Sequence, residues 1–219
     1  MSNSVVGIVD YGMGNLFSVG FACKSVGIKY SFIKKPEDFK NNLNGIILPG
    51  VGAFSEAMKY LKKNKMDKLI KEWANMNKPL LAICLGYQLL FEKSEEFEIT
   101  EGLGILKGSV KSIKKSLIGS ELSACVPIIG WQNTKIYNDH FHLKNNCFSK
   151  KTNEYFYYLH SYFVEPKDFF IVSSTASYGN LTYAASVTTD GIFGCQFHPE
   201  KSGKKGLDIY RNFKKNIGC

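Results

Sequence analysis

The sequence predicts an α/β fold with a mostly parallel central sheet flanked by helices and an additional, partly antiparallel region in the second half. Strand-like apolar runs alternate with helical segments over residues 5–90, the pattern of parallel strands joined by crossover helices. Shorter alternating segments follow in the remainder of the chain. The chain has 219 residues, 44% of them apolar, and no linker, repeat or low-complexity stretch. We therefore expect a single domain over residues 1–219.

The first expected strand is V-V-G-I-V, residues 5–9, a short apolar run that ends at Asp10 and glycines. A helix is expected over residues 16–27, where apolar residues recur at helical spacing and Gly27 provides a stop signal. The alternating segment I-K-Y-S-F-I, residues 28–33, predicts the next strand.

The apolar run G-I-I-L-P-G, residues 45–50, predicts a third strand. Residues 53–77 have helical spacing, and six large apolar side chains are available for a buried face: Phe54, Met58, Leu61, Leu69, Ile70 and Trp73. Residues 80–83 predict a fourth strand. Because strand and helix alternate, we expect helices on both faces of the sheet.

The second half contains alternating segments that are typical of antiparallel strands, at residues 109–113, 155–164, 169–175, 183–188 and 192–197. Residues 206–217 predict a closing helix. These segments account for the antiparallel part of the predicted fold.

Composition excludes several classes of protein. No apolar run approaches the ~20 residues of a membrane helix, and the N-terminus does not resemble a signal peptide, so we expect a cytoplasmic protein without a membrane partner. The net charge is +9, but the lysines are spread in ones and twos, which argues against a nucleic-acid partner. None of the six cysteines forms a C-x-x-C pair, so reduced thiols are expected: Cys23, Cys84, Cys125, Cys147, Cys195 and Cys219.

The stretch A-I-C-L-G, residues 82–86, has the spacing of a nucleophile elbow. Small residues at Ala82 and Gly86 permit a very tight turn from strand to helix around Cys84. A helix beginning near Leu85 would favour the Cys84 thiolate through its N-terminal dipole. A buried cysteine at the end of a strand explains this stretch equally well.

Two further stretches have chemical potential. In Q-F-H-P-E, residues 196–200, His198 and Glu200 are two apart in an extended segment, so a carboxylate would orient an imidazole. A lone H-x-E is nevertheless more typical of an exposed loop. The glycines of L-P-G-V-G-A-F, residues 48–54, present backbone N–H groups as an oxyanion hole requires, although a plain strand-to-helix turn has the same composition.

The stretch D-H-F-H, residues 139–142, is a weak indication of a metal site. Nothing at zinc-ligand spacing completes it, so a solvated loop is the favoured interpretation and no metal is expected.

Together, P-G-V-G, C-L-G-Y-Q and H-P-E, in this order, resemble the class I glutamine amidotransferase family. Further stretches are similar to one branch of that family, the glutaminase subunits of imidazole glycerol phosphate synthases: I-V-D-Y-G-M-G-N-L, E-G-L-G-I-L-K-G, G-W-Q, Y-F-Y-Y-L-H-S-Y and F-H-P-E-K-S-G. The resemblance runs from about residue 5 to the C-terminus. It implies a flavodoxin-like fold and no cofactor.

The resemblance implies that Cys84, His198 and Glu200 form a triad that hydrolyses L-glutamine to glutamate and ammonia through a thioester. The family match assigns the oxyanion donors and substrate-binding residues as follows: the N–H groups of Leu85 and of the Val51–Gly52 turn, and then Gln88, Glu96, His160, Ser161 and Tyr162. In this reading His160 lies near the site without being a second base.

The chain is too short to include a synthase domain as well, so the resemblance implies a heterodimer with a (β/α)8-barrel cyclase subunit. Ammonia would pass through the barrel to make imidazole glycerol phosphate and AICAR in histidine biosynthesis, and acceptor binding would switch on the glutaminase through the P-G-V-G turn. Residues that match the barrel-facing surface are Asn15, Trp131, Tyr157 and Lys201.

The chain departs from the family in P-I-I-G-W-Q, residues 127–132, where Ile128 stands for a usual histidine and Gln132 for a usual asparagine. Since the stretch is expected near the docking surface, a paralogous subunit that supplies ammonia for amidino-sugar biosynthesis is the alternative. A catalytically idle regulatory subunit and a peptidase-like cysteine hydrolase also remain open.

Overall fold

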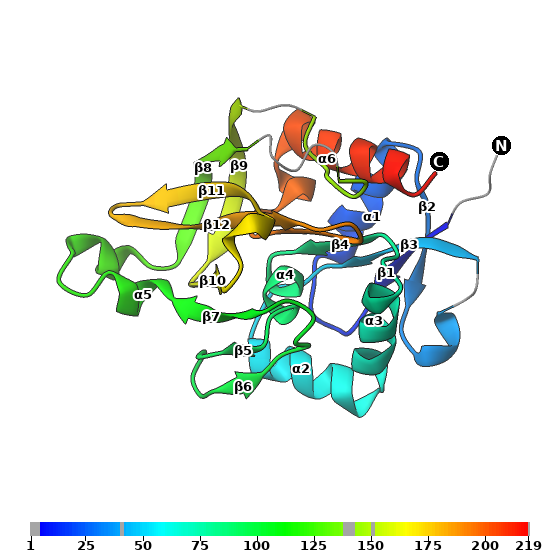
Figure 1. Cartoon of the computed structure of the whole chain (residues 1–219), viewed down its shortest axis with the longest axis horizontal. Coiled ribbons are helices and arrows are strands. Elements are labelled where there is room, and N and C mark those ends of the chain that lie inside the picture. The colour runs from blue at the N-terminus through cyan, green and yellow to red at the C-terminus, as the bar shows by residue number, and fades with distance from the viewer. Residues whose placement is uncertain (1–4, 40–41, 138–142, 150–151, 219) are drawn as a thin grey trace.

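A nine-stranded sheet dominates the computed structural model, which describes residues 5–39, 42–137, 143–149 and 152–218 (Figure 1). Its strands, in spatial order, are β2 (Lys29–Ile33), β1 (Val5–Val9), β3 (Leu43–Leu48), β4 (Leu80–Ile83), β13 (Ile192–Cys195), β12 (Leu181–Thr188), β11 (Val172–Tyr178), β8 (Ile128–Ile136) and β9 (Thr152–His160).

The sheet has two halves that differ in strand direction. β2, β1, β3, β4 and β13 pair in parallel, whereas β12, β11, β8 and β9 pair antiparallel. The predicted fold class is therefore confirmed, including the antiparallel region in the second half. The run predicted over residues 155–164 is interrupted at Ser161, where β9 ends and β10 (Tyr162–Pro166) enters another sheet.

That other sheet has four strands within the described part of the chain. In spatial order they are β10, β7 (Gly108–Ser112), β5 (Lys93–Ser94) and β6 (Thr100–Glu101). It lies beside the antiparallel half of the main sheet (Figure 1), where β10 contacts β12, and its strand β6 contacts α2 (Phe54–Lys63).

Helices cover both faces of the parallel half, as the sequence predicts (Figure 1). α1 (Leu16–Ser25) and α6 (Gly203–Asn216) pack on one face, and α2 (Phe54–Lys63) and α3 (Met66–Asn75) on the other. The stretch expected to be helical over residues 53–77 is thus two helices, separated where Lys65 takes a φ of 58°. The remaining short elements are α4 (Leu85–Leu89), α5 (Ile113–Ser116) and the 3₁₀ turns η1 (Pro36–Asp38), η2 (Glu121–Cys125), η3 (Phe169–Ile171) and η4 (Pro199–Lys201).

The core is divided by the sheet into two clusters. Val6 and Ile8 of β1 face the cluster that includes α1 and α6, while Val9 faces the one that includes α2 and α3. Among the residues described, no helix combines the length and the apolar character that crossing a bilayer demands.

β3, β4 and β13 are neighbours and run in the same direction. Their carboxyl ends therefore lie at one edge of the sheet, where ligands of open parallel sheets usually bind. The P-G-V-G turn follows β3, Cys84 follows β4, and the segment with His198 follows β13. The topology thus gathers at one edge the three stretches that the sequence singles out.

Candidate active site

Cys84 stands at a strained turn between β4 and α4. Its φ of 52° and ψ of −109° are rare for a residue with a side chain. A Cβ atom on Gly86 would collide with the carbonyl oxygen of Leu48, so glycine is required there. This geometry is that of a nucleophile elbow. α4 has only five residues, so the individual N–H groups at its start matter more than the dipole expected from a longer helix.

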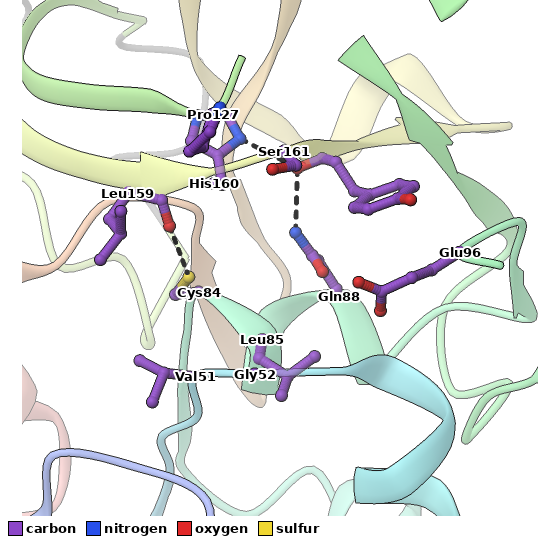
Figure 2. Close-up of a pocket in the computed structure, with 11 residues that line it drawn as sticks. Val51, Gly52, Cys84, Leu85, Gln88, Glu96, Pro127, Leu159, His160 and Ser161 are labelled. Carbon is purple, nitrogen blue, oxygen red and sulfur yellow. Dashed lines mark hydrogen bonds between the residues drawn. The ribbon is translucent and has the colours of Figure 1, made fainter. Parts of the chain in front are cut away.

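Cys84 opens into a cavity of about 260 Å³. Nine residues that the sequence predicts for the site line it: Val51, Gly52, Cys84, Leu85, Gln88, Glu96, His160, Ser161 and Tyr162. Figure 2 shows Cys84 and Glu96 on opposite sides of Gln88, with Val51 and Gly52 on one wall and His160 and Ser161 on the other. The cavity is therefore built from both halves of the sequence.

The far end of the cavity is polar. The Nε2 group of Gln88 donates to the Tyr162 carbonyl at 3.0 Å, as Figure 2 shows. Glu96 accepts a hydrogen bond from the backbone N–H of Phe54, at the start of α2, over 2.6 Å. Partial burial raises the pKa of Glu96, although the bond from Phe54 opposes this shift. An amide oxygen and a carboxylate are suited to the α-ammonium group of an amino acid.

The P-G-V-G turn lies directly against the elbow. The Tyr11 hydroxyl donates to the Pro49 carbonyl at 2.6 Å and fixes the start of the turn. The backbone N–H of Leu85 donates to the Gly50 carbonyl at 3.3 Å. This predicted oxyanion donor is thus engaged by a carbonyl of the turn, and a negative oxygen would need that carbonyl to move away.

His198 and Glu200 are both buried, with side chains that are each 2% exposed. His198 Nδ1 lies 2.8 Å from Glu200 Oε1. The segment is attached to β9, because the His198 N–H donates to the Tyr157 carbonyl and Ser202 Oγ accepts from the Tyr157 N–H. Ser202 Oγ in turn donates to the His198 carbonyl. This burial excludes the alternative interpretation of the H-x-E stretch, in which His198 would be an exposed loop residue.

The electrostatics of His198 favour its protonated form. Burial disfavours the charged ring, but Cys84 and Glu200 outweigh it and raise the pKa of His198 to about 10. Its Nε2 atom is buried and has no hydrogen-bond partner among the described residues. With Nδ1 held by Glu200, Nε2 is the nitrogen available to a reacting group.

His160 has both ring nitrogens occupied. Nδ1 lies 2.9 Å from the Tyr162 carbonyl, which can only accept, so Nδ1 carries the hydrogen. Nε2 lies 3.3 Å from the Tyr183 hydroxyl. Burial lowers the pKa of His160 to about 4. A neutral, fully bonded imidazole is poorly placed to be a second base.

Three of the four predicted partner-facing residues lie together on one surface. The rings of Trp131 and Tyr157 meet edge to face with centroids 6.3 Å apart, and Lys201 Nζ lies 5.7 Å from the Tyr157 centroid. Asn15 accepts a hydrogen bond from the Ser18 N–H as the cap of α1, which packs against η4. β8 and β9 extend this surface with exposed Ile129 and Tyr155. We call Ile129, Trp131, Tyr155, Tyr157 and Lys201 the aromatic face.

Ile128 and Gln132 do not belong to the aromatic face. Side chains alternate along a strand, so these two residues point to the side of β8 opposite Trp131. Ile128 is 2% exposed and packs in the core, paired across the sheet with His160. Ile128 is therefore turned inward and Gln132 points away from Trp131, so neither substituted side chain lies on the aromatic face.

Several residues of the site escaped the sequence analysis. Pro127 and Leu159 line the cavity, and the Leu159 carbonyl accepts from Cys84 Sγ at 3.7 Å (Figure 2). Gln196 donates to Cys84 Sγ from its Nε2 at 3.6 Å. The Q-F-H-P-E stretch contained a signal for Gln196, whereas a contact made by a backbone carbonyl has none. The stretch Asp139 to His142, considered for a metal, lies outside the described residues.

The chain is similar to known proteins over nearly its whole length. The family model described as "Glutamine amidotransferase class-I" matches residues 8–217. The imidazole glycerol phosphate synthase subunit HisH of Caldanaerobacter subterraneus is 42% identical over 215 residues, which are 98% of this chain and 100% of that protein. The subunit of the same name from Bacillus subtilis is 40% identical over 212 residues and covers 96% of each chain.

Solved structures show the same fold. A chain of the PurLQS structure from Thermotoga maritima superimposes with a TM-score of 0.74 at 19% identity, covering 97% of this chain and 98% of that one. A structure titled as a glutamine amidotransferase superimposes with a TM-score of 0.72 at 16% identity, covering 99% and 100%.

The buried neutral His160 makes stability depend on pH in a defined direction. The unfolded chain takes up a proton near pH 6.5, whereas folded His160 resists it until about pH 4. The free energy of unfolding should therefore fall as the pH drops from 6.5 toward 4, by up to about 1.4 kcal/mol per pH unit from this group. His160→Asn keeps a donor for the Tyr162 carbonyl but has no imidazole to titrate, so it should lose this pH-dependent part of the free energy of unfolding.

Urea unfolding at pH 7, 6 and 5 measures the effect as the difference between wild type and His160→Asn. We expect that difference to shrink or reverse at low pH. Tyr183→Phe leaves His160 buried and should retain the wild-type slope. A difference that stays constant from pH 7 to pH 5 would contradict the burial of a neutral ring.

Proposed function

The chain belongs to the class I glutamine amidotransferase family, and we propose that its Cys84 cavity releases ammonia from L-glutamine through a Cys84–His198–Glu200 triad. It is the glutamine-hydrolysing subunit of an imidazole glycerol phosphate synthase, an enzyme of histidine biosynthesis, like its relatives of about 40% identity. The observation that carries the triad is the buried pair of His198 and Glu200 beside Cys84 at the elbow.

In the proposed reaction, glutamine lies in the cavity with its side-chain amide at Cys84. Gln88 and Glu96, with the backbone around Ser161, hold the polar groups of the amino acid. The Cys84 thiolate attacks the amide carbon, and the carbonyl oxygen becomes negative. His198 donates its Nε2 proton to the amide nitrogen as the C–N bond breaks, so that ammonia departs and a thioester remains. Water, deprotonated by His198, then attacks the thioester and releases glutamate. Glu200 keeps the ring of His198 in one orientation throughout.

The P-G-V-G turn is the proposed switch. In the conformation described above, the Gly50 carbonyl accepts from the Leu85 N–H, which leaves no free donor at that point for the developing oxyanion. The Gly50 carbonyl and the Val51 N–H belong to the same peptide group. Rotation of this group by half a turn would direct the Val51 N–H, in place of the Gly50 carbonyl, toward the site. Leu85 and the Val51–Gly52 turn would then supply two donors, which stabilise charge only in the transition state.

The proposed partner is a (β/α)8-barrel cyclase that receives the ammonia, docked on the aromatic face. Exposed aromatic side chains beside a cation are typical of interface hot spots, and the aromatic face adjoins the cavity through Leu159, the cross-strand neighbour of Ile129. The relatives of about 40% identity are subunits of imidazole glycerol phosphate synthases, which does not favour a sugar-modifying paralogue.

We further propose that residues 1–219 form one domain and that the chain works in the cytoplasm. The single domain is supported by the family match over residues 8–217 and by the nine-stranded sheet, to which both halves of the sequence contribute strands. The cytoplasmic location rests on the five free cysteines of the described residues and on the biosynthetic relatives.

Replacement of the nucleophile tests the reaction. Cys84→Ala should lower glutamate release, measured with the barrel subunit present, by at least about 10³-fold, since no other group in the cavity can form the thioester. Cys23→Ala, a change at another buried cysteine, is the matched control and should stay within a few-fold of wild type. Equal rates of glutamate release in Cys84→Ala and wild type would support an idle regulatory subunit instead.

Replacement of Trp131 tests the docking surface. Trp131→Ala should weaken binding of the barrel subunit by at least about tenfold, because a 54%-exposed indole at the centre of the aromatic face would be buried on docking. Calorimetric titration measures the Kd. Phe32→Ala, an exposed aromatic on β2 at the opposite edge of the sheet, is the control. Equal affinities in the two variants would exclude the aromatic face as the interface.

A further inference from the structure

Gln196 occupies a position between the nucleophile and the substrate-binding part of the cavity. It follows β13 and is completely buried. Its Nε2 group donates to Cys84 Sγ at 3.6 Å, and its Oε1 atom accepts from Gln88 Nε2 at 3.1 Å. The mechanism proposed above gives this side chain no role.

The direction of this chain of hydrogen bonds is fixed from one end. The Tyr162 carbonyl can only accept, so the amide nitrogen of Gln88 must face it. The second N–H of that nitrogen then points to Gln196, which must accept the hydrogen bond with its Oε1 atom. This leaves the N–H₂ group of Gln196 facing sulfur. Rotating either amide by half a turn would set two acceptors or two donors against each other.

The two polar neighbours of Cys84 Sγ therefore favour opposite states of the sulfur. The Leu159 carbonyl accepts from an S–H group and so favours the thiol. An N–H donor favours the thiolate, because hydrogen bonds to a charged acceptor are stronger. Cys84 is only 5% exposed, so little water is present to solvate a negative sulfur. The Gln196 amide replaces part of that solvation.

We infer that Gln196 is a further catalytic residue that stabilises the Cys84 thiolate by donating its amide N–H to the sulfur, in an orientation set by Gln88 and the Tyr162 carbonyl. The inference rests on the proposed function for its benefit to catalysis, but the interaction with sulfur does not depend on glutamine. It also connects the nucleophile to Gln88, a residue that lines the substrate cavity. A residue that served only to fill space between β13 and α4 would not affect the charge of the sulfur.

Alkylation of Cys84 by iodoacetamide measures the thiolate directly. The rate is followed from pH 5 to pH 10 on the full chain, with the modified cysteine identified by mass spectrometry. Gln196→Met keeps the volume but removes the donor, and should slow alkylation of Cys84 at neutral pH by about tenfold, moving the midpoint of the pH profile upward by about one unit. Gln196→Glu keeps the shape but places a carboxylate beside the sulfur, and should move the midpoint further.

Cys195→Ala is the matched control, since it truncates the buried neighbour on β13 and should leave the midpoint unchanged. If Gln196→Met does not fold, Gln196→Glu alone decides, because it is isosteric with the wild-type residue. Midpoints that stay at the wild-type value in the folded Gln196 variants would overturn the inference.

Glutamate release with the barrel subunit separates this inference from the proposed function. We expect kcat/KM of Gln196→Met to fall by about tenfold in parallel with the alkylation rate at the same pH. If the Gln196 variants shift the alkylation profile but the wild-type protein releases no glutamate, the proposed function would be contradicted and the thiolate interaction would still hold. Normal glutaminase activity in Gln196→Met with an unshifted profile would contradict the inference alone.

Discussion

β3, β4 and β13 lie side by side in parallel, and the segment after each of them contributes one part of the candidate site. The P-G-V-G turn, the Cys84 elbow and the segment from Gln196 to Glu200 are far apart in sequence. They meet because the carboxyl ends of parallel neighbours share an edge. A slip of one residue in the pairing of β13 with β4 would turn every β13 side chain to the other face and remove His198 from Cys84.

The strain at Cys84 depends on this arrangement. A residue with a side chain keeps a φ of 52° only when its surroundings hold it there. The Cys84 N–H donates to the Cys195 carbonyl at 2.8 Å, and the absence of a Cβ on Gly86 lets α4 approach Leu48. The elbow is thus fixed from β13 on one side and from β3 on the other. In the proposed reaction, these contacts spare the enzyme from ordering its nucleophile each time substrate binds.

The sequence predicted local features well and long-range ones poorly. Elbow, turn and H-x-E segment were recognisable because each is contained in a few residues with a distinctive composition. The hydrogen bonds from Gln88 through Gln196 to Cys84 could not be recognised in the sequence. Gln88 and Gln196 are 108 residues apart, and their contact depends on the order of the strands in the sheet. The strand β8 was not predicted, because its outward residues are mixed polar and aromatic and hide the alternation of a strand. Without that strand, the inward direction of the Ile128 side chain could not be predicted. The break at Ser161 was hidden inside a continuous apolar pattern.

Cys84 is the proposed nucleophile that reacts with glutamine. The most direct measurement is mass-spectrometric mapping of the adduct formed by a diazo-ketone analogue of glutamine, with the barrel subunit present. The proposal predicts one adduct per chain, on Cys84, whose formation is blocked by excess glutamine. An unmodified Cys84, or an adduct on another cysteine that glutamine does not protect, would contradict it.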